Sequence, residues 1–142
     1  MFLADFQVSE PVLPEESVKI KVNPVAGEGE LPNIMMCAYS PRAIREDGLF
    51  GECYSFSLGH LQRSERAQDQ LYINWLGVHK KFQNRGWGRY LLIRTLWEAQ
   101  KIGYKHSLLS TGEKNHRALL FYTNYGYRVL HSSYTFVKSL SE

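Results

Sequence analysis

The feature that most constrains this chain is a glycine-containing loop that joins a predicted strand to a predicted helix. The run from Leu71 to Val78 is apolar on both faces, as expected of a central strand. The run from Tyr90 to Ile102 repeats apolar residues at helical spacing. Between the two lies Gln83-Asn84-Arg85-Gly86-Trp87-Gly88. Because the first N–H groups of a helix have no intrahelical partner, this order predicts a backbone cradle for an anion.

The charges around this loop support the same prediction. No acidic residue lies between Asp69 and Glu98, whereas several cations do, namely Lys80, Lys81, Arg85, Arg89 and Arg94. Cations at a helix N-terminus oppose the helix dipole, so their clustering is unexpected unless an anion lies among them. We therefore expect a bound anion at this loop, and a phosphate group fits best.

Composition narrows the classes of function. A chain of 142 residues suits one domain, and 44% hydrophobic with 22% charged residues is typical of a folded protein. A net charge of +3 is too small to imply a nucleic-acid partner. No apolar run approaches the roughly 20 residues of a membrane span, and the first residues lack the order of a signal peptide. With Cys37 and Cys53 expected as free thiols, we predict a cytoplasmic protein without membrane partners.

The first third of the chain is expected to be loop-rich. All five prolines and the glycine-rich segment 26–30 lie within the first 41 residues. The predicted elements are a strand from Ser17 to Val22, a helix from Pro32 to about Tyr39 and a short helix from Pro41 to near Gly48. A strand follows from Phe50 to Leu58, with Phe50, Tyr54, Phe56 and Leu58 on one face, and then a solvated loop from His60 to Asp69.

The second half has stronger patterns. A helix from about Trp87 carries a continuous apolar stripe made of Leu91, Leu92, Thr95, Leu96, Ala99 and Ile102, and ends at Gly103. The elements predicted after it are a strand from Tyr104 to Ser110, a helix from Asn115 to Tyr125 that stops at Gly126, and strands at Tyr127–His131 and Tyr134–Val137. This order predicts an α/β or α+β domain with mixed strand directions.

The glycine spacing distinguishes between the known phosphate-binding motifs. Leu91 stands where a dinucleotide fingerprint needs its third glycine, and no Gly-Lys-Ser/Thr ends the loop as in a nucleotide P-loop. The spacing Gln83-x-x-Gly86-x-Gly88, directly after Leu76-Gly77-Val78, resembles the signature of the GNAT superfamily of acyl-CoA-dependent N-acetyltransferases. A second segment, Asn115 to Tyr122 closed by Gly126-Tyr127, resembles a further motif of that superfamily.

The resemblance covers roughly residues 70 to 137 and implies a fold. It implies a mixed, mostly antiparallel central sheet of about six strands flanked by about four helices. It also implies one domain over residues 1–142, with a shortened, loop-rich N-terminal part at 1–49 and a cofactor-binding core at 50–142.

The resemblance further implies roles for single residues. Backbone groups of Leu76 and Val78 would pair with the pantetheine arm of acetyl-CoA, and Asn115 would bind near it. The pyrophosphate would be held by the segment Gln83, Asn84, Arg85, Gly86, Trp87, Gly88 and Arg89. Tyr122 would protonate the coenzyme A thiolate while a primary amine attacks the thioester directly. No metal is expected, because the histidines lack metal-ligand spacing.

Each of these residues also has a structural interpretation. Gly86 and Gly88 could serve only a tight turn, Asn115 could be only a helix N-cap, and Tyr122 could be a core aromatic. Position 72, where many family members carry a glutamate, is a tyrosine. The proton acceptor is therefore open between Glu52, His60, Glu65, His79 and a water chain.

Two further expectations follow from these departures. Loss of the base would leave a catalytically silent acyl-CoA-binding or regulatory module, which is the alternative to an enzyme. A shortened domain with an unsatisfied sheet edge is expected to pair with another chain or a partner domain. We expect a homodimer built by the N-terminal segment or by the last two predicted strands.

Overall fold

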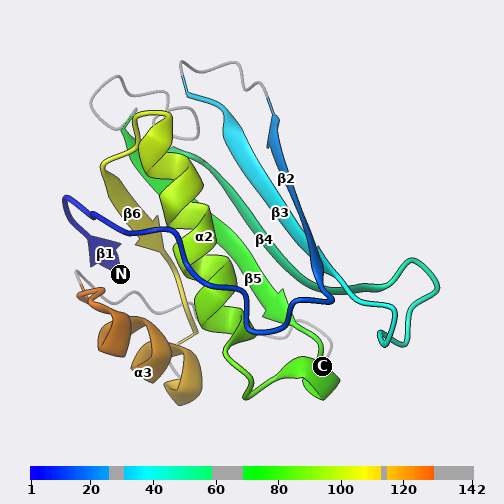
Figure 1. Ribbon diagram of the computed structural model, residues 1–142. Coiled ribbons are helices and arrows are strands. Elements are labelled where there is room, and N and C mark those ends of the chain that lie inside the picture. The colour runs from blue at the N-terminus through cyan, green and yellow to red at the C-terminus, as the bar shows by residue number, and fades with distance from the viewer. Residues whose placement is uncertain (26–30, 59–68, 113–114, 130–142) are drawn as a thin grey trace, which may run out of the picture.

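The computed structural model describes residues 1–25, 31–58, 69–112 and 115–129 (Figure 1). They form a six-stranded sheet in the order β1-β6-β5-β4-β3-β2. The strands are β1 (Phe2–Leu3), β2 (Lys19–Val25), β3 (Asn33–Tyr39), β4 (Leu49–Ser57), β5 (Gln70–Val78) and β6 (His106–Leu109). The helices are the 3-10 helix η2 (Lys80–Phe82), α2 (Trp87–Lys101) and α3 (His116–Tyr125).

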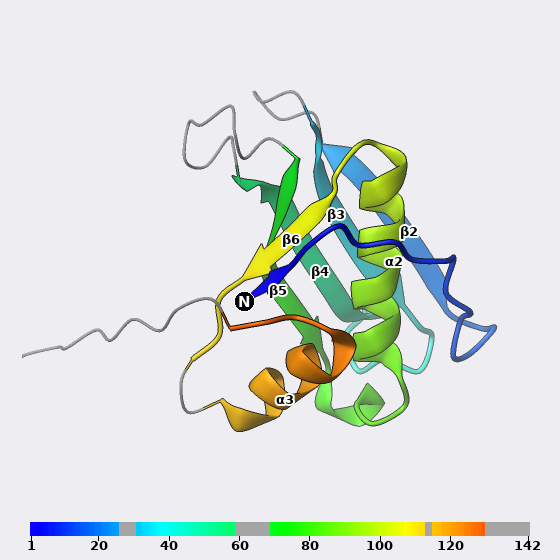
Figure 2. The ribbon, with the colours of Figure 1, turned by 90° about the vertical axis from the view of Figure 1, so that its left-hand side faces the viewer.

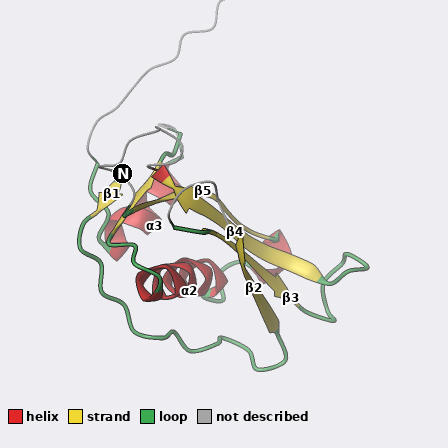
Figure 3. Ribbon diagram, turned by 90° about the horizontal axis from the view of Figure 1, so that it is seen from above, coloured by secondary structure: helices red, strands yellow, loops and turns green. Residues whose placement is uncertain are grey.

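The sheet confirms the predicted mixed fold. The β5–β6 pair is parallel, whereas the other four pairs of neighbouring strands are antiparallel. The described residues hold two α-helices, fewer than expected from the family. Figure 3, seen from above, shows α2 lying along one side of the sheet.

Helix α2 organises the core. Its predicted stripe faces β3, β4 and β5, and the side chains of Leu91, Leu92 and Leu96 are completely buried. Thr95 is equally buried, and its hydroxyl donates a hydrogen bond of 2.7 Å to the carbonyl of Leu91. The stripe is therefore a core face, as the periodicity indicates. Opposite it, alternate residues of β3 are buried beneath the helix, namely Ile34, Met36 and Ala38.

A segment without regular structure, residues 4–18, crosses the outer side of α2 and is called the N-terminal strap here (Figures 1 and 2). The side-chain amide of Gln100 accepts from the N–H of Val8 at 2.9 Å and donates to its carbonyl at 2.5 Å. Phe6 and Val18 of the strap are buried. Helix α2 is therefore enclosed between the sheet and the strap.

The helix predicted from Pro32 to Tyr39 is wrong, because Asn33–Tyr39 is strand β3. This strand pairs with β2 on one side and with β4 on the other. A central strand that is at least partly covered on both faces has no alternation of apolar and polar residues. Its short apolar run is therefore equally compatible with a short helix. Hydrogen bonding to β2 and β4 therefore makes this segment a strand and not a helix.

The short helix predicted from Pro41 to Gly48 is also wrong, because these residues form turns. The N–H of Ser40 donates to the carbonyl of Gly48 at 2.8 Å, which closes the loop at its base. Gly48 has a φ of 79°, a left-handed conformation that glycine adopts without strain. A segment this short has too few residues to offset the cost of starting a helix.

Strand β4 is confirmed, but its predicted faces are partly wrong. Tyr39 pairs with Leu49 and Ala38 with Gly51, so Phe50 lies in a bulge. Phe50 therefore turns away from the face expected for it and packs beside α2, where its ring stacks on Phe82 at a centroid distance of 4.1 Å. A bulge moves one side chain to the other face, and alternation alone does not predict it.

Three of the other predicted strands are confirmed, and the last two lie partly or wholly outside the described residues. The strands expected at Ser17–Val22, Leu71–Val78 and Tyr104–Ser110 are confirmed as β2, β5 and β6, and both helices of the second half are confirmed. Strand β1 was not predicted; it pairs with β6 and extends the sheet. The strand at Tyr134–Val137 and the last two residues of the one at Tyr127–His131 lie outside the described residues, and the described part of the latter holds only an isolated antiparallel bridge between Arg128 and Phe2. The first residues pair within their own chain, and the expected homodimer stays a prediction.

We predict that Gln100→Ala lowers the free energy of unfolding by roughly 1–3 kcal/mol, because both hydrogen bonds to the strap are lost. Urea unfolding measures this. Lys101→Ala is the matched control on the same helix, because the described contacts of its ammonium group are with Glu98 and Trp97 of α2 itself and not with the strap. Equal unfolding midpoints for the two variants would mean that Gln100 does not secure the strap.

We also predict that stability falls as pH rises from about 10 to about 12. Burial raises the pKa of Tyr104 to about 12 from its ordinary value of 10.0. The unfolded chain therefore loses this proton at a lower pH than the folded chain, so the contribution is complete below pH 10 and is lost above it. Urea midpoints across this range should fall less steeply in Tyr104→Phe. Identical slopes would exclude Tyr104 as a source of the alkaline loss.

Candidate functional site

The site begins where two neighbouring strands separate. Strands β5 and β6 pair from Gln70 with His106 to Ile73 with Leu109. β5 then continues to Val78 and keeps β4 as its partner to the end, through the pair of Gly51 with Val78. Among the described residues, the second half of β5 therefore has an open edge on the side of α3.

The glycine loop lies directly beyond the end of β5. The side-chain amide of Gln83 donates to the carbonyl of Val78 at 2.9 Å and ties the loop back to the strand. Asn84 and Gly86 both have positive φ, at 63° and 87°. Gly86 is the N-cap of α2, and no side chain in the described part caps this helix. The first amides of α2 are therefore available to an anion, as the sequence predicts.

A cavity of about 420 Å³ lies between the loop, the end of β5 and α3. It contains every site residue expected from the sequence except Arg85. Its wall is made by Leu76, Val78, Gln83, Asn84, Gly86, Trp87, Gly88, Arg89, Asn115, Arg117, Ala118, Phe121 and Tyr122. The two sequence segments that suggested the family therefore meet at one place (Figure 2).

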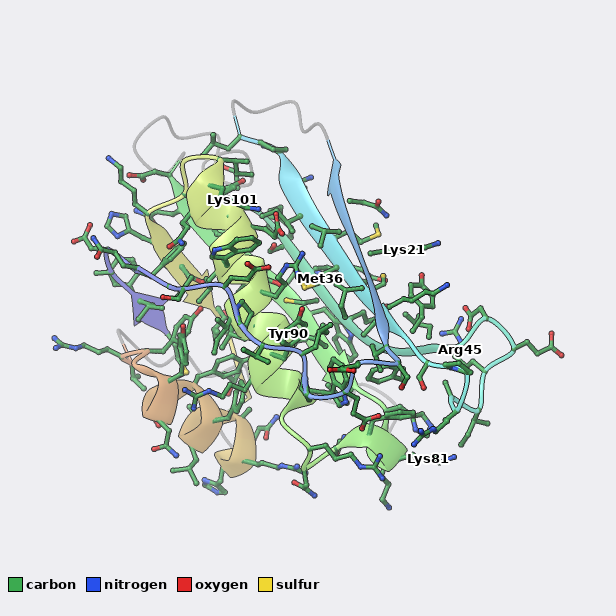
Figure 4. The ribbon with its side chains drawn as sticks, viewed as in Figure 1. Lys21, Met36, Arg45, Lys81, Tyr90 and Lys101 are labelled. Carbon is green, nitrogen blue, oxygen red and sulfur yellow. The ribbon has the colours of Figure 1, made fainter. Side chains whose placement is uncertain are left out.

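The five cations do not surround the cavity as a group. Arg89 lines it, and its guanidinium lies 6.0 Å from the centre of the Tyr125 ring. Arg85 lies 3.5 Å from Glu15 of the strap. Arg94 pairs with Glu98 at 3.0 Å on α2. Lys81 donates to the carbonyl of Arg42, and Figure 4 shows it on η2 near the turn that carries Arg45. Tertiary partners thus account for much of the charge that the sequence left unexplained.

Arg117 is a cavity residue that the sequence reasoning missed. Its guanidinium donates to the side-chain oxygens of Gln83 at 3.3 Å and Asn84 at 3.0 Å. These bonds link the start of α3 to the glycine loop and place a second positive charge beside the α2 N-terminus. The signal for it was its position inside the segment Asn115–Tyr122, together with its charge.

Asn115 and Tyr122 lie on the α3 side of the cavity. The Asn115 side chain accepts from the N–H of Ala118 at 3.1 Å, so it is a helix cap as well as a cavity residue. The Tyr122 ring meets Phe121 and Tyr127 edge to face. Burial, and to a lesser degree Cys53, raises the pKa of Tyr122 to about 12. Its hydroxyl therefore keeps its proton at neutral pH and can act as an acid.

The residues considered as proton acceptors do not line the first cavity in the described part of the chain. Glu52 and His79 line a second cavity of about 260 Å³, whereas His60 and Glu65 lie outside the described residues. The hydroxyl of Tyr72, at the position of the family's glutamate, donates to Ser110 at 3.2 Å. Within the described ranges, no group of three His, Cys, Asp or Glu side chains could hold a metal ion, and no helix is long and apolar enough to cross a membrane.

The fold is shared with solved acetyltransferases. A GNAT acetyltransferase from Elizabethkingia anophelis with bound acetyl-CoA superposes with a TM-score of 0.60 at 18% identity, over 82% of this chain and 80% of that one. An aminoglycoside acetyltransferase from an uncultured soil metagenomic sample, solved with trehalose, gives 0.61 at 16% identity, over 88% of this chain and 100% of that one. At these identities the likeness concerns the fold.

A transcriptional regulator from Bacillus halodurans gives a TM-score of 0.57 at 17% identity, over 75% of this chain. This chain spans 66% of the regulator's length, just under two thirds. No curated protein sequence matches the chain significantly. Residues 43–129, more than half of the chain, match the family model of the acetyltransferase (GNAT) domain. The chain therefore belongs to the GNAT acetyltransferase family.

Proposed function

We propose that this protein is an N-acetyltransferase that moves an acetyl group from acetyl-CoA to a primary amine. The observation that carries the proposal is the single cavity in which the glycine loop, the open edge of β5 and Tyr122 meet. The acetyl-CoA in the Elizabethkingia acetyltransferase supports the choice of co-substrate. We propose one catalytic domain over residues 1–142, acting in the cytoplasm, where the buried free thiols Cys37 and Cys53 would stay reduced.

The lining of the cavity supports a location for acetyl-CoA along it. Its pyrophosphate would accept hydrogen bonds from the backbone amides between Asn84 and Arg89, with Arg89 and Arg117 adding positive charge. Its pantetheine arm would lie along the open edge of β5, where Leu76 and Val78 have no partner in β6. Asn115 would contact this arm from α3.

The reaction needs a neutral amine, an oxyanion donor and an acid. The amine nitrogen attacks the thioester carbonyl carbon, and the carbon–sulfur bond breaks as the tetrahedral intermediate collapses. A backbone N–H on the open edge of β5, near Leu76, would donate to the carbonyl oxygen as it gains negative charge. Tyr122 would give its proton to the departing sulfur, and its raised pKa keeps the phenol protonated until that step.

A second candidate function is a silent acyl-CoA-binding module. Tyr72 favours it, because a phenol replaces the carboxylate that many family members use and is itself bonded to Ser110. Such a module would bind acetyl-CoA and would release no thiol with any amine. The two candidates share the cofactor cavity and differ only in turnover.

We predict that Gly86→Asp abolishes binding of acetyl-CoA in isothermal titration. A carboxylate beside the first amides of α2 would repel the pyrophosphate, and each lost amide–phosphate contact costs roughly 1–3 kcal/mol. Gly103→Asp is the matched control, because Gly103 also has a positive φ, 114°, but lies at the other end of α2. Absence of binding by the unmodified chain would reject the proposed function.

We predict that Tyr122→Phe lowers turnover by roughly 10²-fold or more and leaves acetyl-CoA affinity nearly unchanged. The variant keeps the ring contacts with Phe121 and Tyr127 and removes only the hydroxyl. Tyr125→Phe, one turn along α3, is the control for loss of a nearby phenol. Unchanged turnover in Tyr122→Phe would make Tyr122 a packing residue.

A further inference from the structure

The second cavity adjoins the cofactor cavity. It lies where the start of β4 meets the end of β5, and its wall includes Arg45, Glu52, Trp75, Gly77, Val78 and His79. Val78 lines both cavities, and Glu52 is paired with Gly77 one residue before it. A molecule in the second cavity would therefore lie beside the strand that we propose holds the thioester.

An aromatic side chain covers the strand at this point. A Cβ atom built on Gly77 would lie 2.9–3.0 Å from three atoms of the Trp75 indole, so only glycine leaves room for the ring. Trp75 remains 53% exposed, although it is a large aromatic side chain. An indole partly open to solvent beside a carboxylate is suited to an organic cation, which is attracted to the aromatic face.

One carboxylate oxygen of Glu52 accepts a hydrogen bond, and the other accepts none in the described part of the chain. The hydroxyl of Tyr54 donates to its Oε2 at 2.5 Å, and this bond is the main cause that raises the pKa of Tyr54 to about 12. Tyr54 therefore stays a donor and fixes the carboxylate. No hydrogen bond engages Oε1 in the part of the chain that the structure describes. A carboxylate with one free oxygen in a cavity can accept a proton.

We propose that the second cavity holds the acceptor, a primary alkylammonium, and that Glu52 is its proton acceptor. This inference rests on the proposed function. The ammonium gives one proton to Glu52, and the neutral nitrogen attacks the thioester carbon. The new nitrogen–carbon bond replaces the carbon–sulfur bond, and the nitrogen gives a second proton to water. Tyr122 protonates the sulfur and regains a proton from water, so one proton in total is released.

Glu52 takes over a task that another strand performs in relatives. The glutamate position on β5 is Tyr72, whose hydroxyl bonds Ser110. Glu52 lies on β4, on the far side of the β5 backbone from the open edge. His79 is the other titratable group of the cavity with a base's chemistry, and its Nδ1 accepts from the N–H of Lys81. Arg45 is paired with Asp47 at 3.0 Å, so it does not neutralise Glu52.

The test compares Glu52→Gln with Glu98→Gln, the same chemical change at a carboxylate outside both cavities. The probes are spermidine, lysine ethyl ester and sisomicin, with thiol release measured alongside acetyl-CoA titration. Glu52→Gln should lower kcat/KM for the active probe by roughly 10²-fold or more. Acetyl-CoA affinity and the thermal unfolding midpoint should match those of Glu98→Gln.

The pH dependence separates a base from a structural residue. As pH rises, more of the amine is neutral without help, so the deficit of Glu52→Gln should shrink. The titratable and charged groups around Glu52 are Tyr54, Cys37, Tyr39 and Lys21 from the sheet, and His79 and Arg45 in the cavity wall. His79→Gln therefore belongs in the same series, and it should keep at least a tenth of the rate.

Other results would contradict either the role of Glu52 or the proposed function. Full activity in Glu52→Gln, or a deficit that does not change with pH, overturns the role of Glu52. Loss of activity in His79→Gln alone assigns the base to His79. Acetyl-CoA binding without thiol release from any probe overturns the Glu52 inference and leaves the silent module. Failure of the unmodified chain to bind acetyl-CoA overturns the proposed function itself.

Discussion

The separation of β5 from β6 after Ile73 is the constraint on which the rest of the structure depends. β5 remains paired with β4 as far as Val78, so it keeps its direction in the sheet after β6 has separated from it. The gap that results lies beside α3 and opens onto the first turn of α2. One strand edge, one helix start and one helix face therefore surround a common space. Polar backbone groups without partners at such an edge favour a ligand that can pair with them.

The local patterns of the second half of the chain predicted this region well. The stripe on α2, the loop at Gly86 and the cap at Asn115 depend on residues that are close in sequence, and each has its own chemical signature. Nearly all of the site residues that the family resemblance implied line one cavity. Whether they bind a cofactor stays a prediction, but their meeting in space did follow from the sequence.

The first third of the chain resisted prediction for physical reasons. Strand β3 is defined by its two neighbours and not by its own residues, since a short apolar run suits a helix equally well. Strand β1 is only two residues long and has no periodicity to detect. The charge argument failed in part for a related reason, because Arg85 finds Glu15, seventy positions earlier in the chain. Contacts of that range leave no local signal.

The N-terminal strap has a consequence for how the protein forms. Val8 and Gln100 are 92 positions apart, and Phe2 pairs with Leu108. During synthesis the strap is made before the helix and the strand that it binds, and 92 positions separate Val8 from Gln100. Phe6 and Val18 must remain uncovered for that interval, which is when an apolar segment is prone to aggregate. Such long-range closure slows folding. The strap can therefore close over α2 only after α2 has been made, and only then can Glu15 reach Arg85 of the glycine loop.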